Sequence, residues 1–238
     1  MPSPEPPKPS RHTELMRLIH EVSPYEAFDY TAYPVDLDPA GPHPTFQMMI
    51  EAVRPSLIIE VGTWRGNSAI YMAEHAKSLG LDTTIICVDT WLGGIEHGFG
   101  TPLNQYLLRK HGYPQLYFQF LANVMHRGHQ DTIIPFPATS TIAARWFRYY
   151  GLKADLIYID ASHEYEDVKA DLENYAECLS PRGYMFGDDY LTWPGVTQAV
   201  DEFALKRNGA FIGGPGKFIF LGENAAFDGV PARLAQGG

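Results

Sequence analysis

The sequence predicts an α/β fold, a doubly wound and mostly parallel sheet that ends in a C-terminal antiparallel hairpin. Apolar, strand-like runs alternate along the chain with helical patterns, which is typical of a parallel sheet covered by helices. The 238 residues are enough for one sizeable domain, and 45% of them are hydrophobic while 19% are charged, as in an ordinary globular protein. Two strand-like segments around the Gly-Pro-Gly at 214–216 predict the hairpin.

The N-terminal part of the chain is predicted to be a leader followed by a cap. Residues 1–12 are rich in proline, which predicts a flexible leader of roughly ten residues. An amphipathic pattern predicts a short helix over residues 13–22, and the stretch 23–43, rich in Pro, Tyr and Asp, predicts a loop that covers a site. We therefore expect residues 1–43 to be leader and cap, and residues 44–238 to be the main domain.

The main domain is predicted to alternate helices with strands from its first residues. Short apolar runs predict parallel strands at residues 56–61, 83–89, 132–137, 154–160 and 183–189. Apolar residues at helical spacing predict helices at residues 45–53, 67–79, 138–151, 164–179 and 195–206. The hairpin strands are expected at residues 210–213 and 217–221.

Residues 93–130 separate the second and third predicted strands and are interpreted as an insertion in the main domain. The segment is aromatic and partly helical in pattern, and insertions of this length tend to be functional. Two roles stay open. It forms the wall or lid of an acceptor site, together with Tyr25, Tyr30 and Tyr33 of the N-terminal loop, or it forms the contact in a homo-oligomer.

The net charge and the two cysteines limit the kinds of binding partner and of cellular compartment that fit this chain. A formal net charge of −10 argues against nucleic acid or an anionic membrane as the main partner, because both favour basic surfaces. No stretch reaches the roughly 18 apolar residues that a membrane span needs, so we expect no membrane partner. Cys87 and Cys178 are far apart and form no disulfide framework or zinc cluster, which favours a reducing, cytoplasmic location.

Acidic residues end four of the predicted strands. In open parallel sheets, ligands bind outside the carboxyl ends of the strands. Acids at single strand ends are common as caps and turn residues, but four in one sheet point to a site. They are Glu60, Asp89, Asp160 and the pair Asp188–Asp189.

The turn after the first strand holds Gly62 and Gly66. Glycines there let the backbone bend sharply and approach a ligand closely, and free N–H groups at a helix start favour polar or anionic ligands. The alternative is a tight turn without a ligand. The spacing is not G-x-G-x-x-G, which disfavours a dinucleotide. Asp89, at the end of the next strand, is placed where an acid binds ribose hydroxyls, so a nucleoside-like ligand fits both features.

Four segments together resemble the class I S-adenosylmethionine-dependent methyltransferases, which have a Rossmann-like sheet. They are EVGTWRGNS, ICVDTW, YIDASHEYEDVKADLENYAECLSPRGYMFGDDY and PGVTQAVDEFA. The likeness covers about residues 46–221 and is greatest to natural-product O-methyltransferases, including metal-dependent sugar enzymes of the macrocin and aminocoumarin type. It implies S-adenosylmethionine as the cofactor and a hydroxyl of a small molecule, a natural product or its sugar, as the acceptor.

The resemblance also implies a set of cofactor-binding residues. It assigns Glu60 and Gly62 to the methionine end of the cofactor and Asp89 to the ribose hydroxyls. Trp91 either packs on adenine or covers the sheet edge, and Ser140 lies near adenine. The full set is Glu60, Gly62, Gly66, Ser68, Asp89, Trp91, Ser140 and Asp160.

Asp160, Asp188 and Asp189 are expected to lie together at the ends of neighbouring strands. Three bare carboxylates repel one another, few basic residues adjoin them in sequence, and oxygen ligands suit Mg²⁺ or another hard divalent cation. In the sugar O-methyltransferases that this chain resembles, three acids at these positions hold a metal ion. The ion binds two adjacent hydroxyls of the acceptor and lowers the pKa of the one to be methylated. The alternative is that Asp188 and Asp189 only cap a turn.

His163 is the candidate catalytic base. It follows Asp160 by three residues, and an unperturbed imidazole titrates near neutral pH. The alternatives are a capping or packing histidine, with Asp160 as a competing base.

Three hypotheses on function follow from these residues. The first is an S-adenosylmethionine-dependent O-methyltransferase. The second is a relative with another reaction, such as the cephalosporin hydroxylase proteins, and oxidation of an acceptor without methyl transfer would reveal it. The third is a cofactor-binding subunit without catalysis, against which the full set of acids at the strand ends argues.

Overall fold

The computed structural model describes residues 9–37, 43–207 and 211–221. Most of the predicted leader and residue 210 of the predicted hairpin lie outside these residues. Helix α1 (Arg11–His20) begins two residues earlier than predicted. The reason is the side chain of Ser10, which accepts a hydrogen bond from the backbone N–H of Thr13 at 3.2 Å and so caps the helix at that point.

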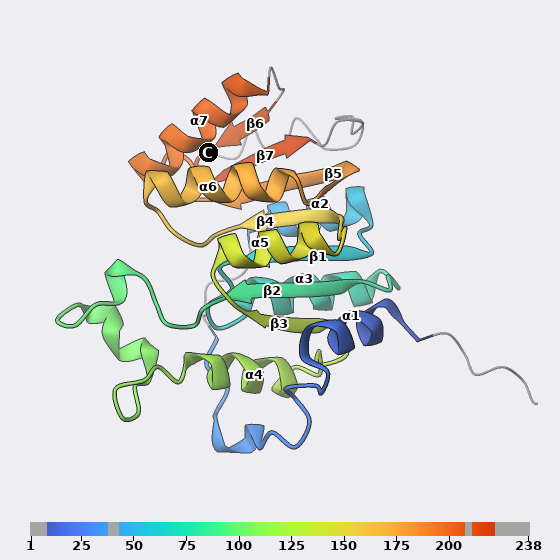
Figure 1. Cartoon of the computed structure of the whole chain (residues 1–238), viewed down its shortest axis with the longest axis vertical. Coiled ribbons are helices and arrows are strands. Elements are labelled where there is room, and N and C mark those ends of the chain that lie inside the picture. Colours follow the sequence, from blue (N-terminus) through green and yellow to red (C-terminus); the bar gives the residue numbers. More distant parts are fainter. Residues whose placement is uncertain (1–8, 38–42, 208–210, 222–238) are drawn as a thin grey trace, which may run out of the picture.

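The described strands form one seven-stranded sheet in the order β3-β2-β1-β4-β5-β7-β6 (Figure 1). The first five strands are parallel, and β7 runs antiparallel to both β5 and β6. This confirms the predicted fold class, including the hairpin. The strands are β1 (Leu57–Val61), β2 (Thr84–Asp89), β3 (Ile133–Pro137), β4 (Ala154–Ile159), β5 (Leu179–Asp188), β6 (Phe211–Gly214) and β7 (Lys217–Leu221).

Helices cover both faces of the sheet, with α5 and α6 in front of it in Figure 1 and α2 and α3 behind it. This arrangement buries the apolar strands on both sides, as a parallel sheet requires. No helix among the described residues is long and apolar enough to cross a membrane. The remaining helices are α2 (Pro44–Val53), α3 (Asn67–Ser78), α4 (Leu116–His126), α5 (Ser140–Tyr149), α6 (Tyr165–Ala176) and α7 (Pro194–Lys206).

The predicted helix over residues 164–179 is wrong at its C-terminal end. Helix α6 ends at Ala176, and Leu179 opens β5, where it pairs with Ala154 of β4. An apolar residue four positions after Tyr175 fits a helix face and a buried strand equally well, so the local pattern could not decide. Pairing with β4 decided it, and β5 is therefore longer than predicted.

The segment predicted as an insertion divides into two parts. Helix α4 is part of the globular core, with Phe120 and Asn123 among its fully buried residues. The part from 93 to 115 is irregular apart from two short 3-10 helices, and it extends away from the sheet in Figure 1. Several of its apolar side chains are well exposed, including Ile95, Phe99 and Tyr113, whereas Leu107 is fully buried.

The N-terminal segment covers the edge strand β3. The Nε2 of His20 hydrogen-bonds the carbonyl oxygen of Pro135 at 2.6 Å. The hydroxyl of Tyr25 donates to the carbonyl oxygen of Ile133 at 3.2 Å. An edge strand otherwise presents free carbonyl groups that pair with other chains. The two prolines of β3 suit an edge position, because proline cannot donate to a ladder.

Candidate functional site

The sheet order brings the predicted acids to one edge. Strands β2, β1, β4 and β5 are consecutive neighbours, and all four run in the same direction. Their carboxyl ends, which carry Glu60, Asp89, Asp160 and Asp188, therefore lie side by side. This is the edge at which open parallel sheets bind ligands.

Glu60 is fully buried at the end of β1 and is held by its own turn. The hydroxyls of Thr63 and Ser68 each donate to one of its carboxylate oxygens, and the thiol of Cys87 lies 3.4 Å from it. Burial raises the pKa of Glu60 to about 7, and the hydrogen bonds from Ser68 and Thr63 oppose that shift. The carboxylate is thus placed beneath the turn, with donors that share its charge.

Position 62 requires a glycine, because the end of β1 and the end of β4 approach each other closely there. Its φ is +83°, and a Cβ there would lie 2.5 Å from Cα of Ala161 and closer still to the carbonyl oxygen of Asp160. The close contact that the sequence suggested for a ligand is therefore made within the chain, between the end of β1 and the end of β4. Gly66, with φ +89°, is the N-cap of α3.

Asp89 joins two loops at the end of β2. Its carboxylate accepts hydrogen bonds from the backbone N–H groups of Thr63 at 3.1 Å, Trp64 at 2.9 Å and Trp91 at 2.7 Å. Burial raises the pKa of Asp89, and these N–H groups lower it. The residue as a whole is half-buried, and its carboxylate fixes the glycine turn at the strand end.

Trp91 lies in the core. Only 1% of the residue is exposed, its indole N–H donates to the carbonyl oxygen of Trp64 at 2.8 Å, and its ring centroid lies 4.9 Å from those of Tyr117 and Phe120. With no exposed ring face, Trp91 fits the alternative in which it packs at the sheet edge, and not a contact with adenine.

Ser140 opens α5, beyond the end of β3. It is half-buried; burial raises the pKa of Asp171 of α6, and the side chain of Ser140 opposes that shift. Its carbonyl oxygen accepts from the hydroxyl of Tyr175 at 3.0 Å. These contacts tie the start of α5 to α6.

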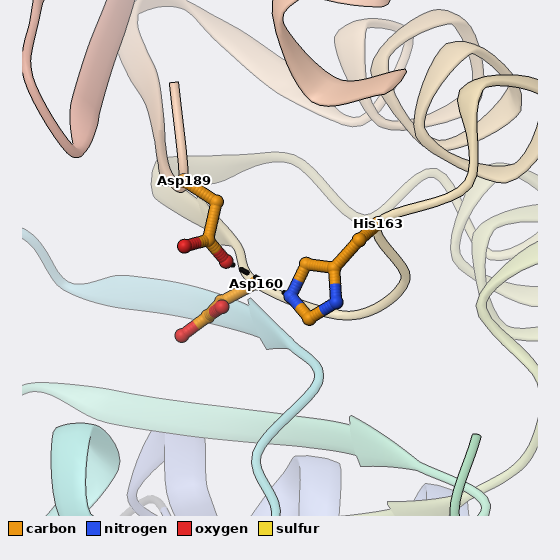
Figure 2. Close-up of side chains that lie close together, drawn as sticks. All are labelled: Asp160, His163 and Asp189. Atoms are coloured by element: carbon orange, nitrogen blue, oxygen red, sulfur yellow. Dashed lines mark ion pairs between the residues drawn. The ribbon is translucent and has the colours of Figure 1, made fainter. Parts of the chain in front are cut away.

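Asp160, His163 and Asp189 converge beyond the ends of β4 and β5 (Figure 2). One ligand atom from each lies within 4.8 Å of the others. The His163 Nε2 is 2.9 Å from Oδ2 of Asp189, and the imidazole stacks on Trp193 at 4.4 Å with 6° between the rings. The hydrogen bond to Asp189 raises the pKa of His163, although burial lowers it. Two carboxylates and an imidazole of this kind form a possible metal-binding set.

Asp188 pairs with Lys217. The two residues are opposite each other across β5 and β7, and the buried ammonium of Lys217 contacts Oδ2 of Asp188. The hydroxyl of Tyr158 lies 2.8 Å from Oδ2 of Asp160 and 3.2 Å from Oδ2 of Asp188. Burial, and then the charge of Asp188, raise the pKa of Asp160 to about 6. The predicted trio of carboxylates is therefore divided, with His163 beside Asp160 and Asp189, and Lys217 beside Asp188.

Two residues of this site were missed by sequence reasoning. Tyr158 could have been found, because it lies in β4 two positions before Asp160, which directly follows the strand, and so shares its side of the sheet. Lys217 follows the Gly-Pro-Gly turn, far from Asp188 in sequence, and only the antiparallel pairing of β7 with β5 brings the two together.

The N-terminal loop is tied to the glycine turn by α4. The side-chain amide of Asn123 donates to the carbonyl oxygens of Asp36 and Arg65, each at 2.9 Å, and its oxygen accepts from the N–H of Asp36 at 3.0 Å. Asp36 also forms an ion pair with Arg65. The described part of the predicted cap, up to residue 37, therefore reaches the turn that follows β1.

A family model for a methyltransferase domain matches residues 59–190, more than half of the 238-residue chain. The chain belongs to the methyltransferase domain family. The matched segment of this methyltransferase domain begins within β1 and ends just after β5, so it includes all the acidic strand ends described above.

A curated relative of this methyltransferase domain is the uncharacterized protein y4gI of Sinorhizobium fredii (strain NBRC 101917 / NGR234). It is 29% identical over 148 residues, which are 62% of this chain and 14% of the relative. The methyltransferase domain thus spans about one seventh of the length of that protein.

Solved structures share the fold of this methyltransferase domain. The O-methyltransferase NovP matches with a TM-score of 0.55 and 21% identity over 75% of this chain and 78% of that one. An O-methyltransferase from Bacillus cereus, solved in complex with SAH, matches with a TM-score of 0.55 and 14% identity. The match covers 92% of this chain and 93% of that one. CalS11, a calicheamicin methyltransferase, matches at 0.53 and 18% over 74% and 78%.

Proposed function

We propose that this protein transfers a methyl group from S-adenosylmethionine to a hydroxyl of a small molecule. The observation that carries the proposal is the division of one sheet edge into two halves. Glu60 and Asp89 lie at the ends of β1 and β2, and Asp160, His163 and Asp189 lie at the ends of β4 and β5. The family match gives the general chemistry of methyl transfer.

The first half of the edge would hold the cofactor. The resemblance assigns the methionine end of S-adenosylmethionine to the turn above Glu60 and its ribose to Asp89. The half-buried carboxylate of Asp89 can accept hydrogen bonds from two ribose hydroxyls, and its three backbone contacts orient it for that task. The likeness to a protein solved with SAH supports this cofactor.

The second half would bind the acceptor with the help of a divalent cation. The donor set fits such an ion, because Asp160 and Asp189 supply oxygen atoms at one point and His163 supplies a nitrogen. The cation, when bound, supplies Lewis acidity that lowers the pKa of an acceptor hydroxyl. Asp160, through the carboxylate oxygen that does not hold the cation, or His163, when its nitrogen does not hold the cation, would take the proton of that hydroxyl.

The acceptor class follows from the likeness to known methyltransferases. NovP is described as an O-methyltransferase, which supports a hydroxyl acceptor, and CalS11 as a calicheamicin methyltransferase, which supports a natural product or its sugar. Formation of a homo-oligomer and a cytoplasmic location stay predictions. Both cysteines are buried and unpaired, which fits a reducing compartment.

The test combines binding with a screen for product. Isothermal titration calorimetry of the purified chain should give micromolar affinity for S-adenosylmethionine. Mass spectrometry of a panel of glycosylated and aromatic hydroxyl compounds should reveal a gain of one methyl group. That gain should stop in EDTA and return with an added divalent cation. No affinity for the cofactor would refute methyl transfer, and oxidised products would indicate the hydroxylase alternative.

A further inference from the structure

Both carboxylate oxygens of Asp188 are used within the protein. Oδ1 accepts the backbone N–H of Asp189 at 2.8 Å. Oδ2 contacts the ammonium of Lys217 and lies 3.2 Å from the hydroxyl of Tyr158. Asp188 therefore has little capacity left for a further ligand.

Lys217 is buried beside Asp188. The residue is only 5% exposed, and its ammonium lies 5.7 Å from the ring centroid of Phe46 and 5.8 Å from that of Tyr158. A buried ammonium without its carboxylate is strongly unfavourable. Its positive charge also acts on Asp160, but it contacts Asp188 directly, so it would repel a metal ion most strongly there.

His163 lies beside Asp160 and Asp189 and is held there by its neighbours. Its Nε2 lies with Asp160 and Asp189 in one cluster, and the stack on Trp193 fixes the plane of the ring. Gly195, at the start of α7, approaches the same residue so closely that a Cβ there would lie 2.5 Å from the carbonyl oxygen of His163. Ring and backbone are therefore positioned by α7.

We propose that Lys217 keeps Asp188 out of the metal site, so that the cation binds Asp160, His163 and Asp189. This rests on the proposed function for the presence of a cation and goes beyond it in naming its ligands and its type. Imidazole favours transition ions, whereas Mg²⁺ and Ca²⁺ favour sites made only of oxygen atoms. The site is therefore selective for an ion such as Mn²⁺ over Mg²⁺, and Lys217 is a positioning residue for that selectivity.

The test is the binding of the metal alone to the purified full chain, without cofactor or acceptor. Calorimetric titration should show Mn²⁺ at least tenfold tighter than Mg²⁺. His163→Gln should weaken the binding of Mn²⁺ at least tenfold and remove the preference for Mn²⁺ over Mg²⁺. Pulsed electron paramagnetic resonance should show coupling of Mn²⁺ to an imidazole nitrogen in the natural protein and none in this variant.

A matched variant tests the exclusion of Asp188. Asp188→Asn alone leaves Lys217 without its partner, so the double variant Lys217→Met with Asp188→Asn serves as the neutral control. It should bind Mn²⁺ within threefold of the natural protein. Loss of Mn²⁺ in the double variant, unchanged affinity in His163→Gln, or no Mn²⁺ binding at millimolar concentration would each overturn the proposal. Affinity for S-adenosylmethionine, measured on the same samples, reports separately on the proposed function.

Discussion

A side chain at Gly62 is expected to force apart the two strand ends that carry the site. A Cβ at Gly62 would lie 2.5 Å from Cα of Ala161, whereas ordinary van der Waals contact of a Cβ begins at 3.4 Å. The neighbouring atom is backbone, which cannot rotate away. The turn after β1 or the segment after β4 must therefore shift in Gly62→Ala, and Asp160 shifts with it.

Gly80 provides the matched control for this change. It also has a positive φ, +66°, but no atom lies within 4 Å of a Cβ built there. Gly80→Ala should therefore cost only the strain of a left-handed alanine, about 1 kcal/mol. Gly62→Ala should cost that strain plus about 1–3 kcal/mol for overpacking, or roughly 3 kcal/mol in total.

The assay is urea unfolding of both variants and the natural protein, monitored by far-UV circular dichroism, with Mn²⁺ titration below the unfolding transition. We expect Gly62→Ala to lose the larger free energy of unfolding and to bind Mn²⁺ more weakly, while Gly80→Ala keeps its metal affinity. Equal losses of stability in the two variants would refute the close approach between the ends of β1 and β4.

Three further predictions concern buried or half-buried charges. Asp89→Ala should weaken the binding of S-adenosylmethionine by about 1–3 kcal/mol, measured by calorimetry, because hydrogen bonds to the ribose are lost. Unchanged affinity would show that Asp89 is not in the cofactor site. Burial raises the pKa of Asp171 to about 7, so the folded state holds this proton more tightly, and stability falls as the pH rises from about 4 through 7. Asp171→Asn should therefore gain roughly 2–3 kcal/mol relative to the natural protein between pH 5 and pH 8, whereas Asp167→Asn, on the exposed face of the same helix, should gain nothing; parallel pH curves for all three proteins would contradict this. Lys217→Met should cost about 3 kcal/mol in urea unfolding, because it leaves Asp188 unpaired, and adding Asp188→Asn should recover part of that loss; additive losses would show that the pair is not coupled.

The pattern of the sequence was sufficient for the fold class and for the gathering of four acidic strand ends at one edge of the sheet. Alternating apolar runs and helical stripes predicted the parallel strands and the hairpin, and acids at the strand ends predicted the functional edge. Those features are local, because one strand or one helix turn shows its own apolar face. Asp89 and Asp160 were placed correctly at strand ends for this reason, although their binding roles stay predictions.

Boundaries and side-chain environments were less accessible. Leu179 fits a helix face and a strand equally, and only pairing with Ala154 of β4 made it the start of β5. Trp91 is the second residue after the end of β2, where a site residue would lie. In the folded chain, however, Phe120 of α4 packs on it. In both cases the deciding contact comes from a segment distant in sequence.

What the sequence by itself determined is the set of carboxylates at the edge of the sheet, and what only the tertiary structure decided is how their charges are shared. Repulsion among Asp160, Asp188 and Asp189 demanded a positive partner, and the sequence neighbours offered few. Folding placed Lys217 opposite Asp188 and His163 beside Asp189. Electrostatic energy depends on distance and burial, and both are properties of the packed chain, since residues far apart in sequence set them.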